Sequence, residues 1–204
     1  MLKFGNTYLK FQNNYLSKFH KEPYPFEEVQ IGNQIWMAHN LDINDGGSGI
    51  RVKNDLVVNG VTMPTQYYYT YPAAIRISES VYGWHLPTND EWNTLISYIG
   101  GNNKGYDLQS TSGWNVANGT NLYGFNAIGA GCYTLGQTST GSVDTFMNGG
   151  QDAFFRTSSM SNRYLDSTYF KVLFYNSPKI NTISSNNDAY FSKFSVRLIK
   201  DEDF

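Results

Sequence analysis

Residues 83–92 read Gly83-Trp84-His85-Leu86-Pro87-Thr88-Asn89-Asp90-Glu91-Trp92 and contain the strongest helix-start signal in the chain. Thr88 and Glu91 have the spacing of a capping box, in which each side chain accepts a hydrogen bond from the other residue's backbone amide. Pro87 disfavours helix at the residue before it, so the chain enters the helix from an extended segment. One apolar stripe follows at helical spacing: Trp92, Leu95, Ile96 and Ile99. With Gly100-Gly101 available to end it, we predict the main helix over about residues 89–99.

The composition is typical of a domain rich in strands and loops. The chain has 204 residues, 16% of them charged and 16% aromatic, with 16 tyrosines. Aromatic side chains favour strands, and surfaces rich in Tyr, Asn, Ser and Gly are typical of recognition loops. A formal charge of −2 gives no reason to expect a nucleic-acid partner, because phosphate binding needs clustered Lys and Arg.

Outside the main helix the sequence predicts short strands joined by loops. Apolar and polar residues alternate in Val29–Met37 around Gly32-Asn33, which predicts a hairpin. Further strands are expected at residues 56–58, 67–71, 127–135, 153–157, 169–175 and 194–199, with a brief helix at 72–77. Residues 108–125, 136–152 and 176–188 are rich in Gly, Asn and Ser and are expected to be loops.

Residues 1–19 contain a seven-residue repeat, and residues 20–28 are expected to be a linker to the domain at 29–204. Lys3-Phe4 begins the first copy and Lys10-Phe11 the second, which is too few copies for a coiled coil. Two short strands with a turn fit better, either as an attachment or oligomerisation arm, which we favour, or as the first hairpin of the domain. The aromatic residues expected to make the arm's contacts are Phe4, Tyr8, Phe11 and Tyr15.

The sequence contains no pattern that predicts an enzyme, a metal site or a cofactor. His20, His39 and His85 lack neighbours at metal-ligand spacing, and no nucleophile elbow or phosphate-binding loop is present. We expect His85 to be a structural histidine that is hydrogen-bonded to backbone. A single cysteine, Cys132, excludes an internal disulfide. The sequence has neither the apolar run of a secretory signal nor a membrane-spanning stretch, so membrane insertion is not expected.

Five segments, in order, resemble one protein family. They are Val29–Leu41, Gly83–Trp92, Gly113-Trp114, Tyr123-Gly124-Phe125-Asn126-Ala127 and Ser195-Val196-Arg197. The family is the Fibrobacter succinogenes major paralogous domain, which belongs with the C-type-lectin-like folds, and the resemblance spans about residues 27–201. It implies an α+β domain with small twisted antiparallel sheets, one main helix packed on them, and a face of long loops used for binding.

Four departures from the related families limit what carries over. Ser80 and Leu198 stand where the family usually has cysteines, which agrees with folding outside an oxidising compartment. Phe154-Phe155-Arg156-Thr157 replaces the family's Phe-Trp-Ser-Ser. The lectin calcium motifs are missing, so the resemblance does not imply calcium-dependent sugar binding. Formylglycine-generating enzymes share the broader fold but need paired cysteines, which Cys132 alone does not provide.

These features lead us to expect a non-enzymatic virion surface protein of a phage: a fibre, tail or capsid-decoration component. The arm would contact other virion proteins or further copies of the chain, and the loop face would bind a glycan or protein on the host surface. A purely structural virion joint and a bacterial cell-surface adhesion protein remain alternatives. The candidate contact residues are Arg163, Tyr164, Tyr169, Tyr175, Asn176, Asn181, Asn187 and Tyr190. The residues expected to have structural roles are Trp36, Trp84, His85, Thr88, Glu91, Trp92 and Trp114.

Overall fold

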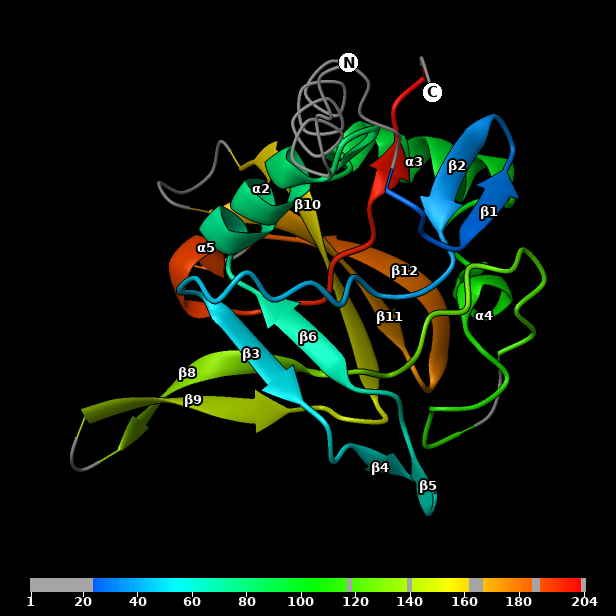
Figure 1. Ribbon diagram of the computed structural model, residues 1–204. Helices are drawn as coiled ribbons and strands as arrows, with labels where there is room; N and C mark the ends of the chain where they lie inside the picture. The colour runs from blue at the N-terminus through cyan, green and yellow to red at the C-terminus, as the bar shows by residue number, and fades with distance from the viewer. Residues whose placement is uncertain (1–23, 117–118, 139–140, 162–166, 185–187, 203–204) are drawn as a thin grey trace, which may run out of the picture.

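The computed structural model describes residues 24–116, 119–138, 141–161, 167–184 and 188–202 (Figure 1). In these residues the chain forms five small antiparallel sheets and four helices. The predicted α+β class is therefore confirmed, with strands predominating. None of the helices in the described ranges has the length and apolarity needed to span a membrane.

The first sheet joins the two ends of the domain. Its strands are β1 (Glu28–Ile31), β2 (Gln34–Met37), β13 (Ile199–Lys200) and β7 (Trp84–His85), in the order β1-β2-β13-β7. Gly32 has a φ of 66° in the β1–β2 turn, and a Cβ there would lie 2.8 Å from the ring of Tyr98. The predicted hairpin is therefore confirmed, and its glycine is required both by the turn and by the close approach of Tyr98.

The helix α3 (Asn89–Tyr98) begins at the predicted capping box. The Thr88 hydroxyl accepts a hydrogen bond from the Glu91 amide at 3.1 Å, and the Glu91 carboxylate accepts one from the Thr88 amide at 2.7 Å. Trp92, Leu95 and Ile96 form its buried face. The expectation of one main helix is wrong, because α2 (Tyr71–Ser80) is equally long. Its buried face consists largely of small residues, which give a weak apolar stripe.

The central sheet consists of β10 (Asp152–Met160), β11 (Thr168–Phe174) and β12 (Ser177–Ile183). β12 lies in the asparagine-rich stretch that was expected to be a loop. It forms a strand because it pairs with β11 from Phe170↔Ile183 to Phe174↔Ser177, and because Ile180 packs into the core. Tertiary pairing therefore outweighs the poor strand propensity of asparagine here.

Three two-stranded sheets complete the described strands. They are β3 (Ile50–Lys53) with β6 (Gln66–Tyr69), β4 (Val57–Val58) with β5 (Val61–Thr62), and β8 (Cys132–Thr138) with β9 (Gly141–Met147). The β8–β9 ribbon extends away from the body of the domain (Figure 1). β9 falls in residues 136–152, so the loop expected there is wrong. In the segment expected to be a strand at 194–199, only Ile199 belongs to one, whereas Phe194 and Ser195 form isolated bridges.

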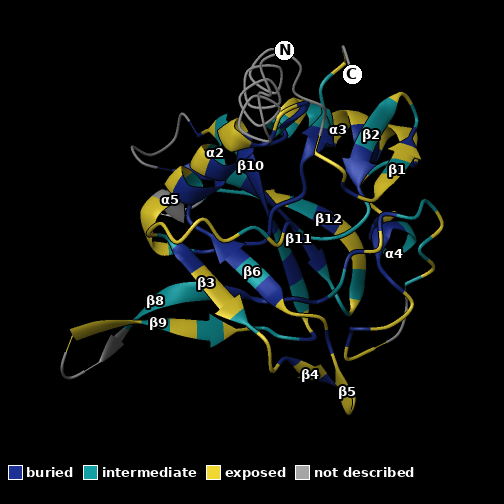
Figure 2. Cartoon of the chain, in the orientation of Figure 1, coloured by how far each residue is buried: buried dark blue, intermediate teal, exposed yellow. Residues whose placement is uncertain are grey.

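The main core lies between α3 and the central sheet. The Trp92 ring lies 5.0 Å from Trp36, 5.5 Å from Phe125 and 5.4 Å from Phe155. Figure 2 shows this interior as buried, while much of the β8–β9 ribbon is exposed or intermediate. In a second buried cluster, α2 packs against Trp84, Val196 and other residues, some of which lie near the two ends of the domain. Two short helices, α4 (Gly105–Leu108) and α5 (Asp188–Phe191), lie at the edges of the domain.

The described part of the expected linker packs against the domain. Phe26 is buried, and its ring lies 5.4 Å from Trp84 in an edge-on arrangement. The Trp84 indole donates a hydrogen bond to the Tyr24 carbonyl at 3.2 Å. Residues 24–28 therefore form part of the folded domain. The expected arm, with Phe4, Tyr8, Phe11 and Tyr15, lies outside the described residues.

Candidate functional site

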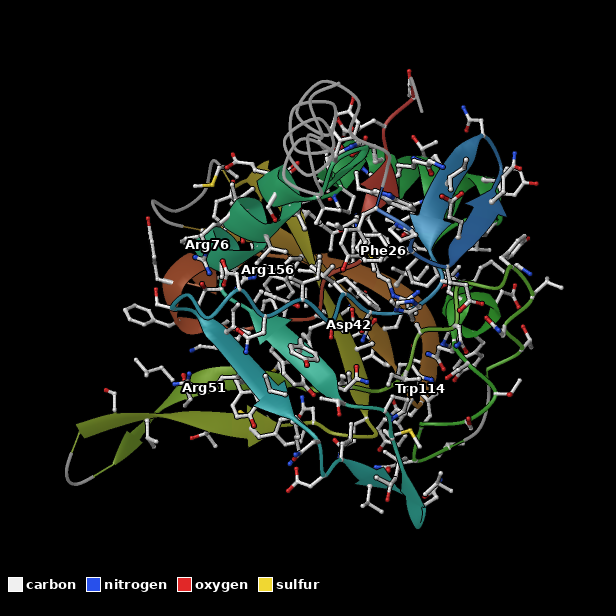
Figure 3. The ribbon with its side chains drawn as sticks, in the orientation of Figure 1. Phe26, Asp42, Arg51, Arg76, Trp114 and Arg156 are labelled. Carbon is white, nitrogen blue, oxygen red and sulfur yellow. The ribbon has the colours of Figure 1, made fainter. Side chains whose placement is uncertain are left out.

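An open groove of about 590 Å³ lies on the flank of the domain where α2, α5 and β3 meet. Figure 3 shows both arginines on this flank, Arg76 beside α5 and Arg51 at the β8–β9 ribbon. The residues that line the groove are Ser48, Gly49, Arg51, Thr70, Pro72, Arg76, Tyr190 and Lys193. Three cations and one exposed tyrosine thus face a single hollow. We call it the basic groove.

A glycine-rich loop, residues 45–49, holds Arg76 in place. The Asp45 carboxylate accepts hydrogen bonds from Arg76 Nε at 2.7 Å and Nη2 at 3.1 Å, and the Ser48 carbonyl accepts another from Nη2 at 3.2 Å. The hydrogen bond from Arg76 lowers the pKa of Asp45 to about 2. A Cβ at Gly47 would lie 2.5 Å from Arg76 Nη2. A side chain at position 47 would therefore require the guanidinium to shift from its present place against the loop.

The other two cations share one carboxylate on the ribbon. Asp144 of β9 lies 2.5 Å from Arg51 Nη2 and 2.6 Å from Lys193 Nζ. Lys193 is 7% exposed, and its backbone exchanges hydrogen bonds with Tyr133 of β8. The ribbon therefore braces this side of the groove, and Arg51 and Lys193 have fixed positions before any ligand arrives.

Tyr190 of α5 forms part of the groove's rim. It is 53% exposed, so much of its ring remains in solvent. An exposed tyrosine offers a rigid apolar face and a hydroxyl at low entropic cost, as in the binding loops of recognition proteins.

A second hollow, of about 350 Å³, is built around the buried guanidinium of Arg197. Arg197 donates to the carbonyls of Met37 at 2.9 Å, Phe125 at 2.5 Å and Asn126 at 3.1 Å, and to Asn40 Oδ1 at 2.8 Å. Burial lowers its pKa to about 9. These acceptors all belong to the domain itself. Arg197 therefore connects the end of β2 to the loop that contains Phe125.

A third hollow, of about 510 Å³, contains His85 between two carboxylates. Nδ1 lies 2.6 Å from Asp201 and Nε2 lies 2.8 Å from Glu91, so the expectation of a backbone partner is wrong. The hydrogen bond that His85 makes with Glu91, together with the one that it makes with Asp201, raises the pKa of His85 despite its partial burial. Burial alone would raise the pKa of Glu91, but hydrogen bonds from His85 and Thr88 lower it. This trio joins β7, α3 and the chain after β13.

The comparisons place the domain in a family. A model of the Fibrobacter succinogenes major domain matches residues 29–200. The chain belongs to this family. No curated protein and no solved structure matched the chain. The match starts within β1 and ends with β13, so it covers all three hollows of this Fibrobacter succinogenes major domain except for the residues that follow Lys200.

The contact residues expected from the sequence do not converge on one site. Tyr190 lies in the basic groove. Tyr175 and Asn176 form the β11–β12 turn, and Tyr175 packs on the main core. Tyr169 lies near the opposite end of β11, and Asn181 lies within β12, where it pairs with Val172. Arg163, Tyr164 and Asn187 lie outside the described residues.

The aromatic residues expected to have structural roles are buried in this family member. Trp36, Trp92 and Trp114 are among its largest fully buried side chains, and Trp84 is 3% exposed. The Trp114 indole donates to the Ala127 carbonyl at 3.0 Å, so it fixes the loop that precedes β8. Among the described residues, no group of three or more His, Cys, Asp or Glu side chains could hold a metal ion. Cys132 is buried, which raises the pKa of its thiol to about 12.

The sequence interpretation missed the three cations of the basic groove. Arg51, Arg76 and Lys193 come from three separate parts of the chain, and only folding brings them together. The glycine-rich segment 45–49 was visible in the sequence as a loop, but its partner Arg76 follows 31 positions after Asp45. The sequence does not show that the 45–49 loop and Arg76 meet. A predicted loop therefore does not by itself predict a binding groove.

Proposed function

We propose that this domain is a non-enzymatic recognition domain of a phage virion surface component, such as a fibre, tail or capsid-decoration protein. It would bind a glycan or protein on the host surface through the basic groove. A C-type-lectin-like organisation, with a small sheet and helices supporting a binding face, is part of the proposal. The groove itself, open and lined by Tyr190 and three cations, is the observation that carries it.

The build of the groove supports binding. Its cations are held by Asp45 and Asp144 in the free protein, so little side-chain entropy remains to be lost when a ligand binds. Two of them are nevertheless accessible, since the side chains of Arg76 and Arg51 are 41% and 50% exposed. Fixed, half-exposed polar groups around an aromatic ring suit recognition of a polar surface.

In the other two hollows, Arg197 and His85 are engaged by groups of the domain itself, which does not favour a catalytic role for either side chain. Arg197 is occupied by acceptors of the domain, and His85 is held by two carboxylates on opposite sides of its ring. A general base needs a ring nitrogen free to reach substrate. Both nitrogens of His85 are engaged, which is the arrangement of a structural ion-pair network.

A purely structural role in the virion is the second candidate, and the β8–β9 ribbon favours it. The ribbon projects from the body (Figure 1), and Val143 and Met147 of β9 are about half exposed. Among the described strands, β8 and β9 pair only with each other, apart from bridges at the base of the ribbon. Unpaired strand edges can take up a strand from another chain. A joint between virion proteins would use such an edge.

A microarray of bacterial surface polysaccharides and outer-surface proteins tests the recognition function. Full-length protein, Tyr190→Ala and Tyr98→Ala are compared, with and without EDTA. Tyr98 is a matched control, because it is 59% exposed and its ring lies against Gly32 in the β1–β2 turn, away from the groove. We expect saturable binding that is insensitive to EDTA, weakened at least tenfold by Tyr190→Ala and unchanged by Tyr98→Ala. Absence of binding to every spot would contradict the recognition function and leave the structural role.

A further inference from the structure

We propose that the basic groove binds the carboxylate of an acidic sugar, a uronic or sialic acid, within a host-surface polysaccharide. The inference rests on the proposed recognition function and names the chemistry that the groove would recognise. Its basis is the arrangement of Arg51, Arg76, Lys193 and Tyr190 around one open hollow.

The charge of the groove favours an anion. Three cations line it, and two carboxylates, Asp45 and Asp144, hold them from behind. The charges of these five side chains sum to one positive charge. Neither aspartate belongs to the lining of the hollow, so a ligand inside it meets the cations first.

The free donors of the arginines match a carboxylate. Arg76 uses Nε and Nη2 for Asp45 and Ser48, and in the described residues its Nη1 donates no hydrogen bond. Arg51 uses Nη1 for the Ile50 carbonyl and Nη2 for Asp144, so its Nε and one hydrogen on each terminal nitrogen remain available. A guanidinium presents its donors in a rigid plane that suits the two oxygens of a carboxylate.

The remaining lining suits a sugar ring. Tyr190 is exposed at the rim and can lie against the apolar face of a pyranose, while Ser48 provides a hydroxyl beside Arg76. The groove is an open hollow, which a residue inside a continuous polymer can enter sideways. A small inorganic anion would use the arginines but leave Tyr190 without a contact. The combination therefore favours a carboxylated saccharide over a free ion.

The first test compares an acidic polymer with its neutral derivative on the wild-type protein. Polygalacturonic acid, fully methyl-esterified polygalacturonic acid, hyaluronan and polysialic acid are titrated by calorimetry at low salt. We expect binding to at least one acidic polymer, with at least tenfold weaker binding to the ester, which keeps the sugar and removes the charge. Hydrogen exchange in the same complexes should show added protection in residues 45–51 and 71–76.

The second test changes the charge of the protein and leaves the polymer unchanged. The double variant Arg51→Gln/Arg76→Gln is compared with Lys104→Gln/Lys179→Gln, which removes two positive charges from exposed lysines outside the groove. We expect at least tenfold weaker binding for the arginine variant and less than twofold for the lysine control. Equal weakening in both would indicate a general charge effect and overturn the inference. If the arginine variant fails to fold, the acid–ester comparison and the hydrogen-exchange pattern still test the inference, because both use the wild-type protein.

The outcomes separate this inference from the function on which it rests. Binding to the bacterial surface array without binding to any of the three acidic polymers would overturn the acidic-sugar inference and leave recognition standing. Equal binding to the acid and to its ester, or protection confined to other segments, would also overturn it. Absence of binding to both the array and the polymers would contradict the recognition function itself.

Discussion

At the scale of single residues, this domain depends on cations placed in its interior. Arg197 is 1% exposed and Lys171 is fully buried. Lys171 donates to Asn93 Oδ1 at 2.9 Å and to Thr182 Oγ1 at 2.6 Å, and burial lowers its pKa to about 8. Such groups cost desolvation energy, so each must be fully hydrogen-bonded to be tolerated.

Replacing Arg197 by Met should be strongly destabilising. The change keeps the side chain's bulk but leaves the carbonyls of Met37, Phe125 and Asn126 and the Asn40 amide oxygen without their donor. We expect a loss of about 3–5 kcal/mol in the free energy of unfolding, measured by urea denaturation. Lys104→Met, at an exposed position, is the control and should change stability by less than about 0.5 kcal/mol. A loss below about 1 kcal/mol for Arg197→Met would show that the network contributes little.

The pH dependence of stability should report the His85 trio. The pKa of His85 is raised in the folded state, so its contribution is fully present below the unfolded value of about 6.5 and is lost as the pH rises through the folded value. The pKa of Glu91 is lowered, so its contribution is lost on acidification instead. We expect the melting temperature to fall between pH 6.5 and pH 9 in the wild type and to change less in His85→Gln. The effect should be modest, since His85 is partly exposed and solvent screens the pair. Identical slopes in both proteins would contradict this assignment.

The roles of some residues follow from partners close in the sequence, whereas the roles of others depend on partners far away in the sequence. Thr88 and Glu91 form their capping box because the spacing alone brings them together. The second carboxylate partner of His85, Asp201, could not be predicted in the same way, because it is 116 positions away. Arg197 was visible only as part of the Ser195-Val196-Arg197 motif, and its role depends on carbonyls from β2 and from the Phe125 loop.

At the scale of elements, periodic segments were predictable and paired segments were not. The helix α3 and the β1–β2 hairpin follow from local spacing. By contrast, β9 and β12 have polar, turn-rich sequences and form strands because β8 and β11 provide paired edges. The sequence of β9 or β12 alone does not show that another strand is available to pair with it.

The cap of α3 gives an element-scale prediction. Thr88→Ala removes the hydroxyl that accepts from the Glu91 amide at 3.1 Å and should lower the free energy of unfolding by about 1 kcal/mol. Thr94→Ala makes the same chemical change inside the helix, where alanine is the better helix former, and should be neutral or stabilising. The two variants are compared by urea denaturation. Equal effects would indicate that the capping box does not stabilise α3.

At the scale of the whole molecule, the domain is a set of small sheets joined around aromatic residues, and its groove exists only when they are assembled. Of the expected contact residues that the structure describes, only Tyr190 lies beside the groove's cations. Composition indicated a recognition surface in the Asn-, Tyr- and Ser-rich residues 158–190, but apart from Tyr190 the residues that line the groove lie outside that stretch. Arg51, Arg76 and Lys193 belong to β3, to α2 and to the segment after α5, respectively, so their meeting is a property of the fold.

The most direct measurement is the binding of the full-length protein and of a variant lacking residues 1–19 to intact bacteria and to their purified capsular polysaccharides. Each is measured with and without EDTA. We expect saturable binding by both proteins, insensitive to EDTA, because the groove lies within residues 24–202 and the polar groups proposed to bind the ligand are Arg51, Arg76 and Lys193. Absence of binding by either protein, together with particle assembly that depends on residues 1–19, would contradict a recognition function and indicate a structural part of a virion.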